Sequence, residues 1–221
     1  MITTVWSVKG GAGASVVAAA ISVLRAGSGP GADPDRPPIE LVDLCGDQPA
    51  VLGIGRPSGP GVRDWLTSPS PDPAALHRLS VPVVDGLRLL PAGERHPVVD
   101  IGALARALAD RPGPVVVDAG VLGGRCGADW EPPGYSLLVV RPCYLALRAA
   151  VGMEHRPDGA VVVEEPGRAL VARDVGDVLG VPVVATVTLD PAVARAVDAG
   201  VLCRRVPRSL SDGLGALDLL R

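Results

Sequence analysis

The chain has 221 residues, of which 48% are hydrophobic and 20% charged, and its formal net charge is −3 at pH 7. That length and apolar content are enough for one domain with a sizeable core, whereas the net negative charge gives no bulk attraction to nucleic acid. No apolar run reaches the length of a membrane span, and no basic region precedes the first one. We therefore expect a cytoplasmic protein whose four cysteines, which lack metal-ligand spacing, stay reduced.

The first two predicted elements are joined by a glycine-rich turn. An apolar run over Ile2–Val8 predicts a strand, and the periodic run from Ser15 to about Ala26 predicts a helix. A strand, a glycine-rich turn and a helix opened by a serine form the layout of a phosphate-binding loop, in which backbone N–H groups and the helix N-terminus face an anion. Glycines are needed there because the backbone must approach phosphate closely and adopt dihedral angles that a Cβ forbids.

The turn also has a distinctive order of residues. It contains Lys9, the only lysine of the chain, but Ala14 stands where a lysine precedes the hydroxyl residue in an ordinary phosphate loop. The pattern Lys-Gly-Gly-x-Gly-x-Ser resembles the deviant Walker A loop of the ParA/MinD family of P-loop ATPases, whose usual form is Lys-Gly-Gly-x-Gly-Lys-Ser/Thr. The resemblance covers every loop position except Ala14.

The resemblance implies a fold, a ligand and a partner. Members of this family have a doubly wound, mostly parallel α/β sheet with helices on both faces, and they bind ATP or ADP with Mg²⁺ at this loop. Their signature lysine, here Lys9, crosses to the phosphates of the partner subunit, which implies a homodimer through the nucleotide face. The residues that carry over to the nucleotide site are Lys9, Gly10, Gly11, Ala12, Gly13, Ala14 and Ser15.

The second predicted strand, over residues 39–44, contains an acidic residue near its end. Ligands gather at the carboxyl ends of parallel strands, so Asp43 is expected beside the phosphate loop. The family typically has Asp-x-Asp here, and the second acid positions or activates the attacking water. This chain has Asp43-Leu44-Cys45, so a thiol fills that position, and Asp47 is an alternative source of the carboxylate. The resemblance thus implies catalytic roles for Lys9, Asp43 and Asp47.

A further acidic residue lies near the end of an apolar strand predicted over residues 114–120. The strand has the form of a Walker B segment and contains Asp118 near its end. An acid at this place can hold Mg²⁺ through water beside the Ser15 hydroxyl, because Mg²⁺ is usually bound by few carboxylates and several waters. A strand-to-turn cap is the alternative explanation. We expect Ser15 and Asp118 to form the metal side of the site.

The rest of the chain alternates between predicted helices and strands, which favours one doubly wound sheet. Helices are predicted over residues 61–66, 72–79, 98–110, 144–151, 169–179, from 190 onward and over 210–221, and strands over 81–84, 87–90, 136–142, 159–164 and 181–189. The glycine-rich segment 121–135 lies where the family has a switch region. The chain contains no asparagine, the residue with which family members often read adenine, so base specificity stays open.

Two features near the end of the chain bear on partners. The terminal segment has one basic residue and two aspartates, which argues against the basic, membrane-lying helix of MinD proteins. Arg204, Arg205 and Arg208 could contact DNA phosphates, as basic residues do in ParA-type partitioning ATPases. A solvated or salt-bridged arginine cluster is the alternative.

The two replaced residues of the family pattern decide the functional hypothesis. Removing one charge-assisted contact costs roughly 1.5–3 kcal/mol, or about tenfold to over a hundredfold in affinity. Our leading hypothesis is a degenerate ParA/MinD-like protein, similar to the small CpaE/TadZ-type relatives, that binds nucleotide weakly or not at all. It would dimerise and act with an unidentified protein partner in positioning cell-division, pilus or secretion machinery. The alternatives are a slow ATPase switch, in which Lys9 reaches its own loop and Asp47 orients water, and a DNA-binding partition-type protein.

Overall fold

The apolar runs of the sequence form the strands of a single sheet. The computed structural model describes residues 1–26, 36–94, 101–122, 131–215 and 217. Within these residues the strands are β1 (Ile2–Ser7), β2 (Ile39–Asp43), β3 (Val81–Val84), β4 (Leu87–Leu90), β5 (Val115–Val121), β6 (Tyr135–Val140), β7 (Gly159–Glu164) and β8 (Val183–Thr188). Their order in the sheet is β3-β4-β2-β5-β1-β6-β7-β8.

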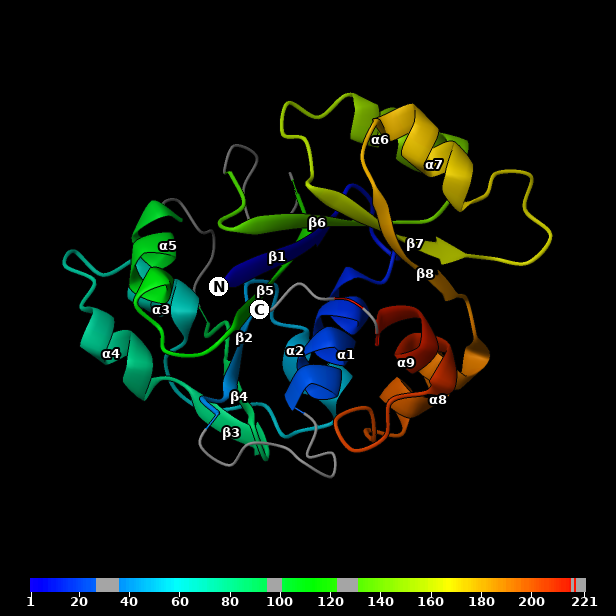
Figure 1. Cartoon of the computed structure of the whole chain (residues 1–221). Coiled ribbons are helices and arrows are strands. Elements are labelled where there is room, and N and C mark those ends of the chain that lie inside the picture. Colours follow the sequence, from blue (N-terminus) through cyan, green and yellow to red (C-terminus); the bar gives the residue numbers. More distant parts are fainter. Residues whose placement is uncertain (27–35, 95–100, 123–130, 216, 218–221) are drawn as a thin grey trace.

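The sheet is parallel except at one edge. Only the short hairpin between β3 and β4 is antiparallel among the strand pairs of the described residues. The central strand β1 lies between β5 and β6, so the strand that precedes the glycine-rich loop has a parallel neighbour on each side (Figure 1). The predicted doubly wound, mostly parallel sheet is therefore confirmed.

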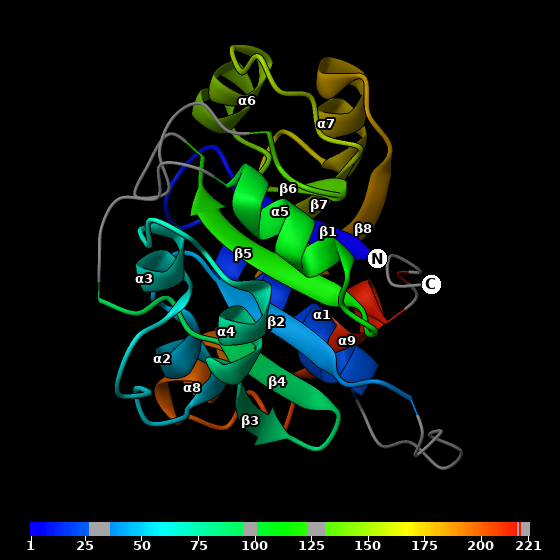
Figure 2. The same ribbon diagram turned by 90° about the vertical axis from the view of Figure 1, so that its left-hand side faces the viewer.

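Helices cover both faces of the sheet (Figures 1 and 2). One face is covered by α1 (Ala14–Ala26), α2 (Gln48–Leu52), α8 (Pro191–Asp198) and α9 (Arg208–Leu214), and the other by α3 (Val62–Leu66), α4 (Pro73–Arg78), α5 (Gly102–Ala109), α6 (Tyr144–Val151) and α7 (Ala172–Leu179). Successive strand residues point to opposite faces. In β1, for example, Val5 packs under α1, and Trp6 packs under α6 and α7. This two-sided burial explains why the strands read as nearly continuous apolar runs.

Most predicted elements are present, and two differences concern helices. The sequence did not predict α2. This five-residue helix has a proline in its first turn, and it is followed by Gly53, which adopts the left-handed conformation that often ends a helix. The terminal helix was predicted over residues 210–221, whereas α9 runs from Arg208 to Leu214; residues 216 and 218–221 of the predicted helix lie outside the described residues. Two glycines near the end of α9 lower helix propensity, and one of them, Gly213, lies against the Thr186 carbonyl group of β8.

Two further helices differ from their predicted bounds. The helix predicted over residues 98–110 runs from Gly102 to Ala109, and positions 98–100 lie outside the described residues. The helix predicted from residue 169 begins at Ala172. The helix expected at the Asp-Pro step does begin there, and the Asp190 side chain accepts a hydrogen bond from the Ala192 N–H at 2.8 Å.

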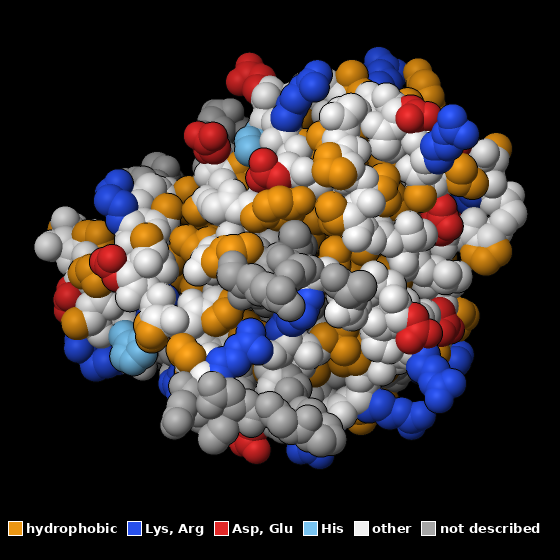
Figure 3. Space-filling model, viewed as in Figure 1, with side chains coloured by type: hydrophobic (Ala, Val, Ile, Leu, Met, Phe, Trp, Pro, Cys, Tyr) orange, Lys and Arg blue, Asp and Glu red, His pale blue; other side chains and the backbone are white. Residues whose placement is uncertain are grey.

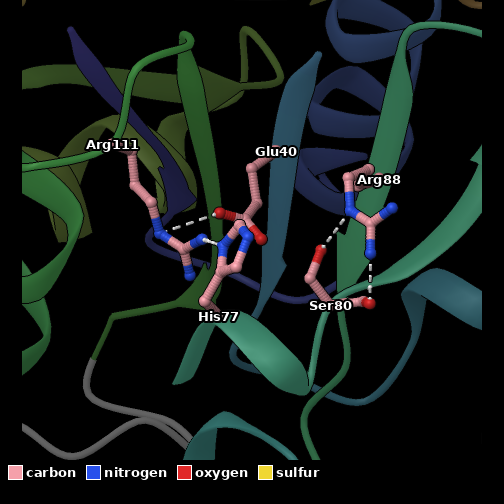
Figure 4. Close-up of polar contacts among 5 residues, drawn as sticks. All are labelled: Glu40, His77, Ser80, Arg88 and Arg111. Carbon is pink, nitrogen blue, oxygen red and sulfur yellow. Dashed lines mark hydrogen bonds and ion pairs between the residues drawn. The ribbon is translucent and has the colours of Figure 1, made fainter. Parts of the chain in front are cut away.

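A polar cluster holds α4 to the sheet at the end of β2 remote from Asp43 (Figure 4). The buried Glu40 carboxylate pairs with the Arg111 guanidinium group at 3.2 Å, and Arg111 also contacts His77 of α4. On the other side of Glu40, Arg88 donates hydrogen bonds to the hydroxyl and carbonyl oxygens of Ser80 at 3.0 and 2.5 Å. These contacts fix the segment that connects α4 to β3.

Among the described residues, no helix combines the length and the apolar character that crossing a bilayer requires. The longest described helix, α1, has 13 residues.

Gly53, at the end of α2, and Gly200, two residues after α8, are in tight contact, which gives a first prediction. Gly53 has φ 72°, and a Cβ added there would overlap the backbone of Gly200. We expect Gly53→Ala to destabilise the protein by about 2 kcal/mol or more, because left-handed backbone and a backbone clash act together. The measurement is the free energy of unfolding in urea. Gly55→Ala is the matched control, since nothing among the described residues lies within 4 Å of its added Cβ. Equal losses of stability in the two variants would contradict the importance of the contact between Gly53 and Gly200.

Candidate functional site

The glycine-rich segment curls between β1 and α1. Gly11 and Gly13 have φ values of 79° and 95°, which lie in the left-handed region that favours glycine. No atom lies within 4 Å of the positions that a Cβ would take at Gly10, Gly11 or Gly13. Helix α1 follows at once, and its first backbone hydrogen bond runs from the Val17 N–H to the Gly13 carbonyl oxygen at 2.9 Å. The loop therefore has the open backbone and the adjoining helix N-terminus that an anion requires.

A cavity of about 540 Å³ joins this loop to the ends of two neighbouring strands. The loop contributes Gly10 to Val16, and the segment after β2 contributes Cys45 and Asp47. Gly120 and Val121, at the end of β5, complete the wall. The segments that the sequence analysis assigned to one site thus meet around one cavity.

The two predicted strand-end acids, Asp43 and Asp118, face each other across β2 and β5. They are register partners, and neither has exposed surface. The Asp43 carboxylate accepts hydrogen bonds from the backbone N–H groups of Cys45, Gly46 and Gln48 at 2.9, 2.7 and 3.2 Å. Burial raises the pKa of Asp43, although these hydrogen bonds and the nearby charge of Arg63 partly oppose that effect. Asp43 therefore shapes the turn that leads into α2.

Asp118 occupies the more constrained position of the pair. Its carboxylate accepts hydrogen bonds from the Gln48 side-chain amide at 2.7 Å and from the Gly120 N–H at 3.1 Å, and it bonds with the Ser15 side chain. Burial first, and then the charge of Asp43, raise the pKa of Asp118 to about 7. Ser15 and Asp118 are thus in contact, as the sequence predicts for the metal side, although their role in binding a cation stays a prediction.

The remaining predicted residues differ in exposure, and Lys9 lines a neighbouring cavity rather than this one. Lys9 is exposed, and Ala14 is buried as the first residue of α1. Cys45 is buried, with its sulfur 3.8 Å from the Asp118 carbonyl oxygen. Asp47 is exposed in the cavity wall, and its side chain makes no capping hydrogen bond to α2. The catalytic roles expected for Lys9, Asp43 and Asp47 stay predictions.

Two residues of the site were not found from the sequence. Gln48 is fully buried, and its amide donates to the Ser15 carbonyl oxygen at 2.9 Å as well as to Asp118. Arg63, on α3, is also buried and donates twice to the Leu44 carbonyl oxygen, at 3.0 and 2.5 Å. Neither residue belongs to a recognisable motif. For Gln48, the one hint in the sequence was its position five residues after Asp43.

The chemistry of the site fits an anion better than a cation. The loop offers backbone amides to a phosphate group, and the amide of Gln48 already donates to the Asp118 carboxylate and to the main-chain carbonyl oxygen of Ser15. A Mg²⁺ ion needs near-octahedral oxygen ligands and retains several waters. The Asp118 carboxylate is therefore already hydrogen-bonded within the protein, which suits a phosphate anion at the loop better than a Mg²⁺ ion held by this acid.

A second cavity lies on another side of the same loop. It has a volume of about 690 Å³ and is lined mainly by apolar side chains of α1, of the end of β8 and of α8. Gly11, Ala12 and Gly13 line both this cavity and the first one. The glycine-rich loop therefore borders two cavities on different sides.

The arginines considered for DNA binding lie near α8 and α9. Arg204, Arg205 and Arg208 are all exposed, and the last two line a cavity of about 660 Å³ together with Arg195 and Asp190. On the face shown in Figure 3, basic side chains lie beside acidic ones rather than in one basic field. Contact between these arginines and DNA stays a prediction.

The buried carboxyl pair predicts a pH dependence of stability. The pKa of Asp118 is about 7 in the folded protein and about 4 in the unfolded chain. Between these two pH values the folded protein therefore keeps a proton on Asp118 that the unfolded chain has already released. The free energy of unfolding should therefore fall as pH rises through this window, by up to about 1.4 kcal/mol per pH unit from this group. In Asp118→Asn, the free energy of unfolding should lose this part of its dependence on pH, which is measured by urea unfolding at several pH values between about 4 and 7. Parallel pH profiles for the wild type and the variant would show that Asp118 is not the group.

Comparison with known proteins links this geometry to a fold. The chain matches no protein-family profile and no curated protein sequence. Solved structures do match it. A ParA family ATPase from Chlorobium tepidum TLS aligns with a TM-score of 0.74 at 18% identity, covering 96% of this chain and 95% of that chain.

Two MinD structures are also similar. The septum site-determining protein MinD of Pyrococcus horikoshii OT3, in complex with Mg-ADP, aligns with a TM-score of 0.67 at 17% identity, covering 95% of this chain and 91% of that chain. The MinC:MinD cell division protein complex of Aquifex aeolicus aligns with a TM-score of 0.68 at 20% identity, covering 90% of this chain and 85% of that chain. The chain therefore has the fold of the ParA and MinD ATPases over nearly its whole length.

Proposed function

We propose that this chain is a degenerate ParA/MinD-like P-loop protein, which binds a nucleotide weakly, hydrolyses it slowly if at all, and acts as a dimerising positioning or scaffolding factor. The observation that carries the proposal is a cavity, formed by a curled glycine-rich loop and the segment after β2, at which two charged residues of the family pattern are replaced, by Ala14 and by Cys45. The fold match supports the ligand class, since the matching MinD of Pyrococcus horikoshii is in complex with Mg-ADP.

Weak binding follows from the charges that remain at the loop. The backbone amides and the N-terminus of α1 supply partial positive charge, but Ala14 supplies none. Lys9 is the remaining lysine, and it lies on the exposed side of the loop. One missing charge-assisted contact weakens binding by roughly 1.5–3 kcal/mol without abolishing it.

Slow hydrolysis follows from the group at position 45. Phosphoryl transfer needs a residue that orients the attacking water, and a buried thiol beside the Asp118 carbonyl group is a poor acceptor for that purpose. Asp47 lies in the wall of the same cavity and is exposed. It is the feature that favours the second candidate function, an active ATP-dependent switch of the ParA/MinD type.

Dimerisation through the nucleotide face is supported by the surface beside the loop. Lys9 shares a cavity with Cys143, the residue immediately before α6. The first turn of α6 exposes two large side chains there, Tyr144 at 68% and Leu145 at 59%. Exposed apolar groups beside a functional loop are common at protein interfaces. An unidentified protein partner in cell division, pilus or secretion machinery is proposed from the resemblance, and the matching MinC:MinD complex supports a protein partner.

Calorimetric titration with ATP and Mg²⁺ separates the two candidate functions. We expect binding weaker than micromolar and turnover too slow to measure in a phosphate-release assay. Lys9→Ala should weaken the remaining binding further, because it removes the remaining lysine of the loop. Micromolar affinity with measurable turnover, both lost in Lys9→Ala, would establish the active switch instead.

A gain-of-function variant tests the role assigned to position 14. Ala14→Lys restores the family pattern, and we expect it to raise nucleotide affinity about tenfold to a hundredfold through one charge-assisted contact. Ala14→Met is the matched control, since it adds a chain of similar length without charge. Equal affinities for the two variants would show that the missing lysine does not limit binding.

A further inference from the structure

We propose that the side-chain amide of Gln48 satisfies the buried acid Asp118 from within the protein, so that the loop binds a phosphate-bearing anion without Mg²⁺. The inference deepens the proposed function, because it concerns the same loop. It does not depend on how tightly a nucleotide binds. It rests on the contacts of one buried residue with Ser15 and Asp118.

Both donor hydrogens of the Gln48 amide are used at this point. One goes to the Asp118 carboxylate at 2.7 Å and the other to the Ser15 carbonyl oxygen at 2.9 Å. Both partners are acceptors in these contacts, so the orientation of the amide is fixed by its partners. The amide oxygen of Gln48 is consequently buried with no hydrogen-bond partner among the residues that the structure describes. The fold therefore keeps the donor half of the amide in place even though its acceptor half is unpaired.

The backbone of Gln48 is itself anchored, and its side chain lies in a packed region. The Gln48 N–H donates to the Asp43 carboxylate at 3.2 Å, and Gln48 is the first residue of α2. Val51 and Leu52 of this short helix are buried in the core formed with α1. Moving the amide away from Asp118 thus requires a shift of α2 or a new rotamer inside a packed region. Gln48 is therefore a fixed part of the site and not a mobile side chain that fills a gap.

The amide meets part of the electrostatic demand that a cation meets elsewhere. In P-loop proteins the metal ion is held by the loop hydroxyl residue and the Walker B acid, and here these are Ser15 and Asp118. The Gln48 amide offers partial positive charge to the same acid at hydrogen-bond distance. The cradle for phosphate and the place for its cation are therefore uncoupled in this chain.

The experiment measures thermal stability with Mg²⁺ or with EDTA at matched ionic strength, so it needs no nucleotide. We expect the wild-type melting temperature to be unchanged by Mg²⁺. Gln48→Glu should melt at a lower temperature in EDTA, because a third carboxylate joins two buried ones, and should recover with Mg²⁺. Gln48→Met, which has a similar shape but no charge and no donor, is the control and should not respond to Mg²⁺.

Direct ion binding to the wild type keeps the inference testable if the variants do not fold. We expect no high-affinity Mn²⁺ site in the wild type by water-proton relaxation, and an affinity for pyrophosphate that changes less than twofold on adding Mg²⁺. Wild-type Mn²⁺ binding that is lost in Asp118→Asn would overturn the inference, as would a Gln48→Glu variant that folds but ignores Mg²⁺. If the wild type binds neither pyrophosphate nor ATP, the proposed nucleotide function fails, whereas the Mn²⁺ and stability measurements still decide the role of Gln48.

Discussion

The burial of two acidic side chains at adjacent strand ends organises the site. Asp43 and Asp118 are register partners without exposed surface, and a buried carboxylate is costly unless its oxygens are hydrogen-bonded. The chain meets this requirement locally. The turn after β2 directs three backbone N–H groups at Asp43, and Gln48 and Ser15 bond with Asp118. The path of the chain from β2 into α2 and the seating of the first turn of α1 follow from these contacts.

This constraint divides the site into two parts with different chemistry. On one side, the loop between β1 and α1 presents glycines whose surroundings are open, so its backbone donors can reach a ligand. On the other side, the acids bond to groups of the protein itself, including Gln48. A P-loop protein that uses Mg²⁺ couples these two parts through the ion. Here they are joined by protein hydrogen bonds, which supports a role in which binding and protein contacts matter more than turnover.

The charges around the loop point in the same direction. Ala14 and Cys45 remove one positive and one negative group of the family pattern, while Lys9 remains on the exposed side. An exposed lysine in this loop can serve a second subunit, and the exposed first turn of α6 offers apolar surface beside it. Retention of Lys9 together with loss of the other two groups therefore favours an assembly function over an enzymatic one.

The sequence by itself determined the fold, the loop and the two acids. Strands such as β4 and β7 and the helix α6 have the predicted bounds, because long apolar runs and periodic stretches between turns depend on local pattern. Only the tertiary structure decided the role of Gln48 and the extent of α9. Gln48 acquires its role from residues 33 and 70 positions away in the chain, Ser15 and Asp118, and α9 ends where Gly213 packs closely against β8. Local patterns carry no information on such contacts, since the partners meet only after the sheet has formed.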